Sequence, residues 1–179
     1  NPTSYPQLSD DGKVLVYIND GNSSSIYDSR AHFSPLNSGV YSPSSQIADP
    51  TGFSGYGDTS VSLSGTDRFA AAAWVRMGTE LPGKNAGDAV TLEEQNLLMN
   101  STEIVVSVYN GTTWTSTRLT NDGTPDLAPV TAVGGDGKAI VFWRSVYTPD
   151  PGTQGSNLLN FTTRDCIMYS CYDSSNGDW

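Results

Sequence analysis

The chain has 179 residues, of which 36% are hydrophobic and only 16% are charged. Its formal charge of −10, with no local Lys/Arg cluster to offset it, excludes nucleic acid as an expected partner. The longest unbroken apolar run, residues 69–75, is too short to cross a bilayer, so we expect no membrane insertion. Abundant aromatic, Gly, Ser, Thr, Asn and Asp residues indicate a folded all-β chain with many turns.

Three segments in chain order share one pattern, which is a strand, a tight Gly/Asp turn, a basic residue and a dense apolar strand. These segments are residues 6–18, 58–76 and 126–144. Asp-Gly turns between apolar runs are typical of β-hairpins, and a second strand that is apolar throughout predicts burial on both faces. We expect the second strands of the later two hairpins at residues 68–77 and 138–146.

A third strand and a turn follow each hairpin. Residues 103–109 and 166–172 are two clear copies, each ending in an Asn/Asp-Gly turn and a tryptophan, and residues 26–28 are a reduced copy in the first repeat. The tryptophan at position 114 opens a fourth strand that runs to Leu119. The four strands therefore form one repeating unit.

The repeat predicts a β-propeller of four-stranded antiparallel blades, with a β-sandwich as the alternative. Residues 1–179 form one propeller segment with approximate repeats 1–47, 48–119 and 120–179. About three blades are present, and three blades cannot close a ring. We therefore expect either a partial ring, completed by the remaining blades of a longer polypeptide, or half of a ring made with a second copy.

Two motifs resemble those of known propeller families. Residues 8–17, Leu-Ser-Asp-Asp-Gly-Lys-Val-Leu-Val-Tyr, resemble the hairpins of Tol-type propellers, and residues 107–114, Ser-Val-Tyr-Asn-Gly-Thr-Thr-Trp, resemble the Asp-box turn of sialidase-like propellers. Tyr109 stands where that motif keeps its aspartate. The whole pattern is similar to repeats in large secreted proteins of anaerobic Gram-positive bacteria. This resemblance implies a propeller and an extracellular or cell-surface location, and it implies no particular activity.

Long connections predict the working face, because loops longer than a hairpin needs are usually functional. Residues 47–57, 78–101 and 147–164 would emerge together at one end of the blades. Within the second of these, Thr91 to Glu94 is a capping box that predicts a short helix through Met99. The candidate ligand-binding residues are Phe53, Tyr56, Arg76, Arg144 and Tyr147.

The two arginines of this set follow the tryptophans of their strands, so we expect equivalent positions for them. They would either converge near the working face or pair with neighbouring acids. The tryptophans themselves, Trp74 and Trp143, we expect to pack between blades rather than to bind a sugar.

A calcium site is the one metal site that the sequence suggests. Asn121, Asp122 and Asp126 form an oxygen-rich cluster, although the spacing and closing Glu of a calcium loop are missing. Asp58 and Asp126 recur at the start of their strands, where they would either line a ligand or calcium site or cap a turn. We expect no cofactor, with calcium as the alternative. Cys166 and Cys171 we expect to be buried free thiols.

Catalysis finds little support in the residue types. His32 is the only histidine, so neither a Ser-His-Asp triad nor a histidine metal site is expected. The first hypothesis is therefore a non-catalytic extracellular module that binds a glycan or a protein through its long loops. The alternatives are part of a sialidase-like or other glycan-acting enzyme with active residues shared across blades, and an architectural spacer or self-associating half-propeller.

Overall fold

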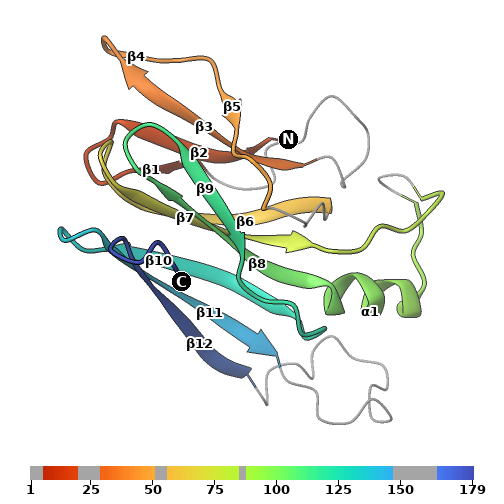
Figure 1. Ribbon diagram of the computed structural model, residues 1–179. Coiled ribbons are helices and arrows are strands. Elements are labelled where there is room, and N and C mark those ends of the chain that lie inside the picture. Colours follow the sequence, from red (N-terminus) through yellow and green to blue (C-terminus); the bar gives the residue numbers. More distant parts are fainter. Residues whose placement is uncertain (1–5, 20–28, 51–55, 85–87, 147–164) are drawn as a thin grey trace.

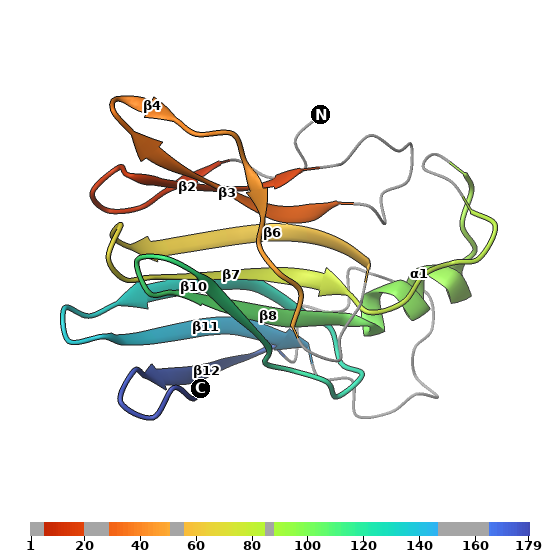
Figure 2. The ribbon, with the colours of Figure 1, turned by 45° about the horizontal axis from the view of Figure 1, so that its top comes forward.

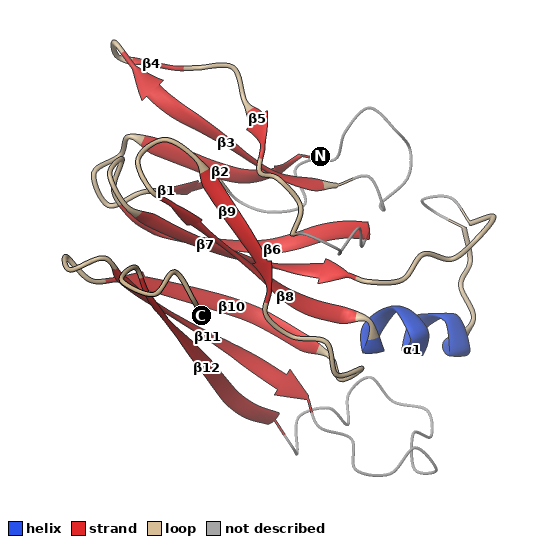
Figure 3. Ribbon diagram, viewed as in Figure 1, coloured by secondary structure: helices blue, strands red, loops and turns tan. Residues whose placement is uncertain are grey.

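The computed structural model describes residues 6–19, 29–50, 56–84, 88–146 and 165–179. Within these ranges the chain folds into three antiparallel β-sheets and one short helix (Figure 1, Figure 3). Each sheet is built from strands that are consecutive in the sequence. The expected all-β class, with antiparallel sheets, is therefore confirmed.

The first sheet has the strand order β1-β2-β3-β4, and β5 also pairs with β3. Its strands are β1 (Gln7–Leu8), β2 (Val14–Asn19), β3 (Arg30–Asn37), β4 (Val40–Tyr41) and β5 (Ser45–Gln46). The third strand of this sheet is β3, which starts after the segment expected to form it. Residues 26–28 lie outside the described residues. The alternation of buried and half-buried residues along β2 shows one face turned toward a core.

The second and third sheets repeat one order of strands. The second sheet contains β6 (Tyr56–Gly65), β7 (Ala70–Met77), β8 (Thr102–Tyr109) and β9 (Trp114–Arg118), with the helix α1 (Leu92–Asn100) between β7 and β8. The third sheet contains β10 (Asp126–Val133), β11 (Lys138–Val146) and β12 (Asp165–Asp173). The first strands of these two sheets also share a bulge, because Ser60 and Ala128, each two residues after an aspartate, have positive φ angles of 52° and 51°.

The second sheet lies between the other two and is covered on both faces, as its dense apolar strands predict. One face packs against the first sheet through a cluster that includes Val16, Ile47 and Trp74. The other face packs against the third sheet through a cluster that includes Val106, Val141 and Trp143. The prediction that Trp74 and Trp143 pack between sheets is therefore confirmed. All eight residues of β8 are buried as a consequence.

The third sheet keeps its outward face uncovered by the described residues. Phe142 on β11 lies opposite Tyr169 on β12, and Ile167 lies opposite Arg144, so these side chains share the outward face. Ile167 is 71% exposed and Tyr169 is 65% exposed. We call this surface the outward face of the third sheet.

The two ends of the sheets differ in the length of the connections that they carry. Turns of a few residues, 66–69, 110–113 and 134–137, lie at one end, which we call the short-turn end. Connections 78–101 and 119–125 lie at the other end, where β11 also ends and β12 begins, and which we call the long-connection end. Figure 2 shows α1 at the long-connection end, beyond the edge of the sheets. Among the described residues no helix has the length and apolarity needed to cross a membrane.

Candidate functional site

A buried ion pair joins Asp58 on β6 to Arg76 on β7. The Arg76 Nη2 donates to Asp58 Oδ2 at 2.8 Å, its Nε donates to Oδ1, and neither side chain is exposed to solvent. Burial alone would lower the pKa of Arg76, but the hydrogen bonds and charges of Asp58 and Asp49 outweigh it and raise that pKa. Asp58 Oδ2 also accepts from the amide of Ala31 at 2.9 Å, so this carboxylate ties the second sheet to the first.

The predicted equivalence of Arg76 and Arg144 is wrong. Asp58 has Arg76 as its Cα partner across the strand pair, whereas Asp126 has Ser145, and Arg144 lies opposite Leu127. Arg144 follows its tryptophan by one residue and Arg76 follows its own by two, so the two arginines point to opposite faces. Arg144 is partly exposed and pairs with Asp165 at 3.3 Å. Both arginines therefore pair with acids, and Arg76 presents no atom to a ligand.

Three carboxylates converge where the second and third sheets meet, at the long-connection end. Glu103 is at the start of β8, Asp126 is at the start of β10, and Asp122 lies in the connection between β9 and β10. One carboxylate oxygen from each of the three lies within 4.8 Å of the other two. Glu103 and Asp126 are buried, and Asp122 is exposed. We call these residues the acidic cluster.

Glu103 is held by groups from the strand and connection that follow it. Arg118 Nη2 lies 3.1 Å from Glu103 Oε1, and Thr120 Oγ1 donates to Oε2 at 2.7 Å. Burial raises the pKa of Glu103 above its usual range, although Thr120 and Arg118 act in the opposite direction. The hydroxyl of Thr120 also accepts from the amide of Ile104 at 2.9 Å, which fixes its position.

Asp126 has one oxygen in a hydrogen bond and one without a donor. Trp143 Nε1 donates to Asp126 Oδ1 at 3.1 Å, while Oδ2 is buried and has no hydrogen-bond partner among the described residues. Burial raises the pKa of Asp126, and the nearby hydroxyls of Thr120 and Ser145 offset only part of that rise. Neither hydroxyl forms a hydrogen bond with Oδ2, because Thr120 Oγ1 donates to Glu103 and Ser145 Oγ lies 3.4 Å from Thr124 Oγ1. The nearby charge of Asp122 raises the pKa further.

The acidic cluster contains two of the three residues predicted for a calcium site, Asp122 and Asp126. Asn121, the third, is an exposed neighbour of Asp122. Glu103 was not predicted, because it belongs to the preceding repeat and reaches the cluster only through the packing of two sheets. A glutamate that opens an otherwise apolar strand was the one sequence signal that could have indicated it.

The predicted aromatic ligand contacts are only partly within the described residues. Phe53 and Tyr147 lie outside them, and Tyr56 begins β6, opposite Met77. The predicted helix is confirmed as α1, with a complete capping box between Thr91 and Glu94. No residue of α1 is buried.

His32 lies on β3 and shows no arrangement for nucleophilic catalysis in the part of the chain that the structure describes. Its Nδ1 is buried without a hydrogen-bond partner there, whereas a catalytic histidine is oriented by a carboxylate at this position. Burial lowers the pKa of His32, and the charge of Asp58 acts against that shift. The imidazole packs near Tyr17, with ring centroids 6.1 Å apart.

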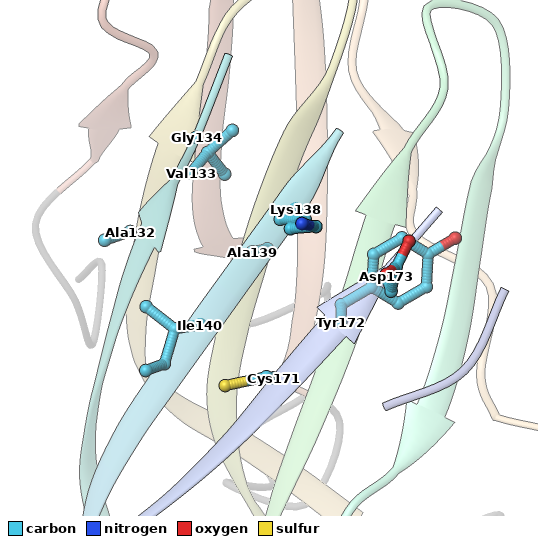
Figure 4. A pocket seen from close by; sticks show the side chains of 9 residues that line it. All are labelled: Ala132, Val133, Gly134, Lys138, Ala139, Ile140, Cys171, Tyr172 and Asp173. Atoms are coloured by element: carbon cyan, nitrogen blue, oxygen red, sulfur yellow. The ribbon is translucent and has the colours of Figure 1, made fainter. Parts of the chain in front are cut away.

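An open hollow of about 400 Å³ lies on the third sheet at its short-turn end. Figure 4 shows the residues that line it, which come from β10, β11, β12 and the turn after β10: Ala132, Val133, Gly134, Lys138, Ala139, Ile140, Cys171, Tyr172 and Asp173. It is mainly apolar and lies at the opposite end of the sheet from the acidic cluster. Cys171 and Cys166 are free, as predicted, but the prediction that they are buried is wrong, because both are exposed.

The comparisons with known proteins leave the site to be interpreted from its geometry. No model of a known protein family matches the chain, and no curated protein matches it.

Proposed function

We propose that the chain is a non-catalytic extracellular binding module, built from three consecutive blades of a β-propeller, and that it recognises a glycan or a protein at its long-connection end. The observation that carries this proposal is the contrast between the two ends of the sheets. The connection 78–101 is far longer than an antiparallel strand pair requires, while the opposite end has turns of a few residues.

The packing of the sheets supports the propeller. A β-sandwich has two sheets that cover each other, whereas here a middle sheet is covered on both faces, as in a ring of blades. The first strands of the second and third sheets also meet directly, since Thr131 N donates to Ser62 Oγ at 3.1 Å. Strands that line the central channel of a propeller are neighbours in this way. The outward face of the third sheet would then receive the next blade.

The helix α1 supports a binding role for the long-connection end. A helix of nine residues is marginal by itself and usually depends on tertiary packing, yet α1 buries no residue. Leu92 and Leu97 are exposed on it. A well-capped helix that adds nothing to the core and presents two leucines fits a surface for a partner.

The acidic cluster does not favour hydrolysis of a glycan. Glycosidases use two carboxyl groups that flank the scissile bond, so both must contact the substrate. Glu103 and Asp126 are 2% and 0% exposed, and both are covered by packed sheets. This burial supports the non-catalytic hypothesis over the enzymatic one.

The test is a screen of the purified chain against an array of glycans and an array of extracellular proteins, with calcium and again with a chelator. Selective binding to one sugar class or one protein would support the proposal. Folded chain that binds nothing on either array, with or without calcium, would contradict it and favour the spacer hypothesis. Release of a product from a bound glycan would instead favour the enzyme.

A paired variant then tests the location of the binding surface. Replacing Leu92 and Leu97 together with serine should weaken binding at least tenfold, because both lie on α1 and neither supports the core. The control is Val40→Ser, which changes an exposed apolar residue on the β4 strand of the first sheet. Equal affinity of both variants would place the binding surface elsewhere.

A further inference from the structure

We propose that Glu103, Asp122 and Asp126 form a site for one calcium ion, which joins the second and third sheets at the long-connection end. This site is separate from the proposed ligand surface on α1. Three observations carry it: the missing counter-charge at Asp126, the unpartnered oxygen of that residue, and the spacing of the carboxylates.

The missing counter-charge appears when the two repeats are compared. Asp58 is the third residue of β6 and Asp126 is the first residue of β10, each in the first strand of its sheet, and both are fully buried. Asp58 is neutralised by Arg76 across the strand pair, but the same register position opposite Asp126 holds Ser145. A buried carboxylate without a counter-charge is costly. A bound cation would take the place that the guanidinium has in the second sheet.

The surrounding charges increase that cost instead of relieving it. Glu103 and Asp122 add two more carboxylates within 4.8 Å, while Arg118 pairs with Glu103 alone among the cluster residues. Three carboxylates and one guanidinium leave two negative charges, which match the charge of a divalent ion. The buried Asp126 Oδ2, which has no donor in the described part of the chain, is the atom expected to bind it.

The spacing of the oxygens fits calcium. Oxygen ligands lie roughly 2.4 Å from Ca²⁺, so two ligands on opposite sides of the ion are about 4.8 Å apart. The three carboxylate oxygens of the acidic cluster all lie within that separation. Magnesium prefers near-octahedral geometry and keeps several of its waters, so a set of three protein carboxylates suits calcium better. An all-oxygen set without His or Cys also disfavours zinc and copper.

Asp122 provides access for the ion. Its Oδ1 accepts from the amide of Thr124 at 2.9 Å and from the hydroxyl of the same residue, which fixes the side chain in a turn. Because Asp122 is exposed while Glu103 and Asp126 are buried, an ion would enter from the solvent side of this connection.

The experiment uses terbium as a luminescent substitute for calcium in the full chain, after treatment with a chelator. The indole of Trp143 hydrogen-bonds to Asp126, so this tryptophan is close enough to sensitise emission from an ion in the acidic cluster. We expect saturable emission with one ion per chain, displaced by calcium at concentrations at which magnesium has little effect. Calorimetry with calcium alone should give the same stoichiometry.

The matched variants are Asp122→Asn and Asp136→Asn. Both change one exposed aspartate in a turn or connection, but Asp136 lies in the short turn between β10 and β11. Asp122→Asn should weaken calcium and terbium binding at least tenfold, and Asp136→Asn should leave both unchanged.

Three results would overturn the proposal: no sensitised emission and no calcium heat from folded chain, equal binding by the two variants, or displacement by magnesium as effective as by calcium. No glycan or protein partner is present in these measurements. Failure of the cation site and failure of the proposed binding function are therefore distinguishable.

Discussion

Asp58 and Arg76 are partners across β6 and β7 and form an ion pair in which both side chains are 0% exposed. The carboxylate of Asp58 also accepts a hydrogen bond from the backbone amide of Ala31 in the first sheet. A single buried acid thus orients a guanidinium inside one sheet and fixes the neighbouring sheet. Asp126 begins the equivalent strand of the third sheet, but there the opposite position is Ser145. The two repeats therefore share the acid and differ in what neutralises it.

Asp58→Asn should destabilise the fold strongly, because it leaves the buried charge of Arg76 without a full partner. Breaking a buried ion pair by removing one member typically costs about 3–5 kcal/mol. Urea unfolding, followed by tryptophan fluorescence, measures this loss. The double variant Asp58→Asn with Arg76→Met should recover part of it, since both charges are then absent.

Asp126→Asn is the matched control for that change. In a buffer that contains a chelator, the free energy of unfolding of this variant should equal or exceed that of the wild type. The substitution removes a buried negative charge with which no Lys or Arg side chain of the described residues pairs. In calcium the wild type should gain stability that this variant does not gain. If Asp58→Asn and Asp126→Asn lowered the free energy of unfolding by similar amounts in the presence of chelator, the contrast between the two repeats would be contradicted.

The sequence predicted those parts of the fold that depend on short-range pattern. The Gly/Asp turns and the apolar runs predicted the strands β7, β8 and β11, and the capping box predicted the helix α1. Each of these signals depends on residues only a few positions apart. The third strand of the first sheet was predicted at residues 26–28, whereas the described strand is β3, which begins at Arg30. In β3, His32 and Pro35 interrupt the apolar pattern, and packing against β2 decides the strand.

The candidate site was only partly predictable, because it depends on register and on the packing of sheets. Spacing along the chain made Arg76 and Arg144 look equivalent, although a difference of one residue from their tryptophans turns them to opposite faces. Glu103 joins Asp126 only because β8 and β10 belong to neighbouring sheets that pack together. No local pattern encodes that contact.

Asp11 should make the stability depend on pH between about 4 and about 2. Burial alone would raise its pKa, but hydrogen bonds from Ser9 and from the amides of Asp67 and Lys13, with the charge of Lys13, lower it from 3.8 to about 2. A carboxylate with a lowered folded-state pKa stabilises the fold above its unfolded-state pKa. That contribution is lost as the pH falls toward the folded-state value.

The variant Asp11→Asn isolates this contribution. At pH 7 it should lower the free energy of unfolding by about 1–2 kcal/mol, a value reduced for solvent screening of a partly exposed group. The difference from the wild type should shrink toward zero near pH 2, as urea unfolding at pH 7, 4 and 2 would show. A difference that stays constant over this range would mean that the carboxylate charge contributes nothing.

Gly65→Ala should destabilise the turn between β6 and β7. Gly65 has a φ angle of 108°, and an added Cβ would lie 2.6 Å from the Cα of Ala70 and closer still to the carbonyl oxygen of Phe69. The backbone of the turn must move to accommodate this Cβ, which should lower the free energy of unfolding by about 1–3 kcal/mol. Gly135→Ala is the control, since no atom lies within 4 Å of its Cβ position. Equal thermal midpoints for the two variants would contradict this turn geometry.

The outward face of the third sheet should make the isolated chain self-associate. Ile167 is 71% exposed and Tyr169 is 65% exposed, on a sheet whose equivalent in the middle of the molecule is covered on both faces. Exposed apolar faces and open strand edges promote association. Sedimentation velocity should therefore show species heavier than the 19.1 kDa monomer as the concentration rises. Ile167→Lys should shift the chain to monomer, and Val40→Lys on the first sheet should not.

The two cysteines report which face is covered. Cys171 lies opposite Ile140 on the outward face, whereas Cys166 lies opposite Ser145, and an odd spacing of five residues places the two on different faces of β12. Both thiols are exposed, so both should react rapidly with a thiol reagent in dilute chain. At high protein concentration Cys171 should react more slowly while Cys166 stays reactive. Association through the outward face would shield Cys171 and leave Cys166 accessible. Equal protection of both thiols would mean that the contact forms along the edge of β12 instead of over its face.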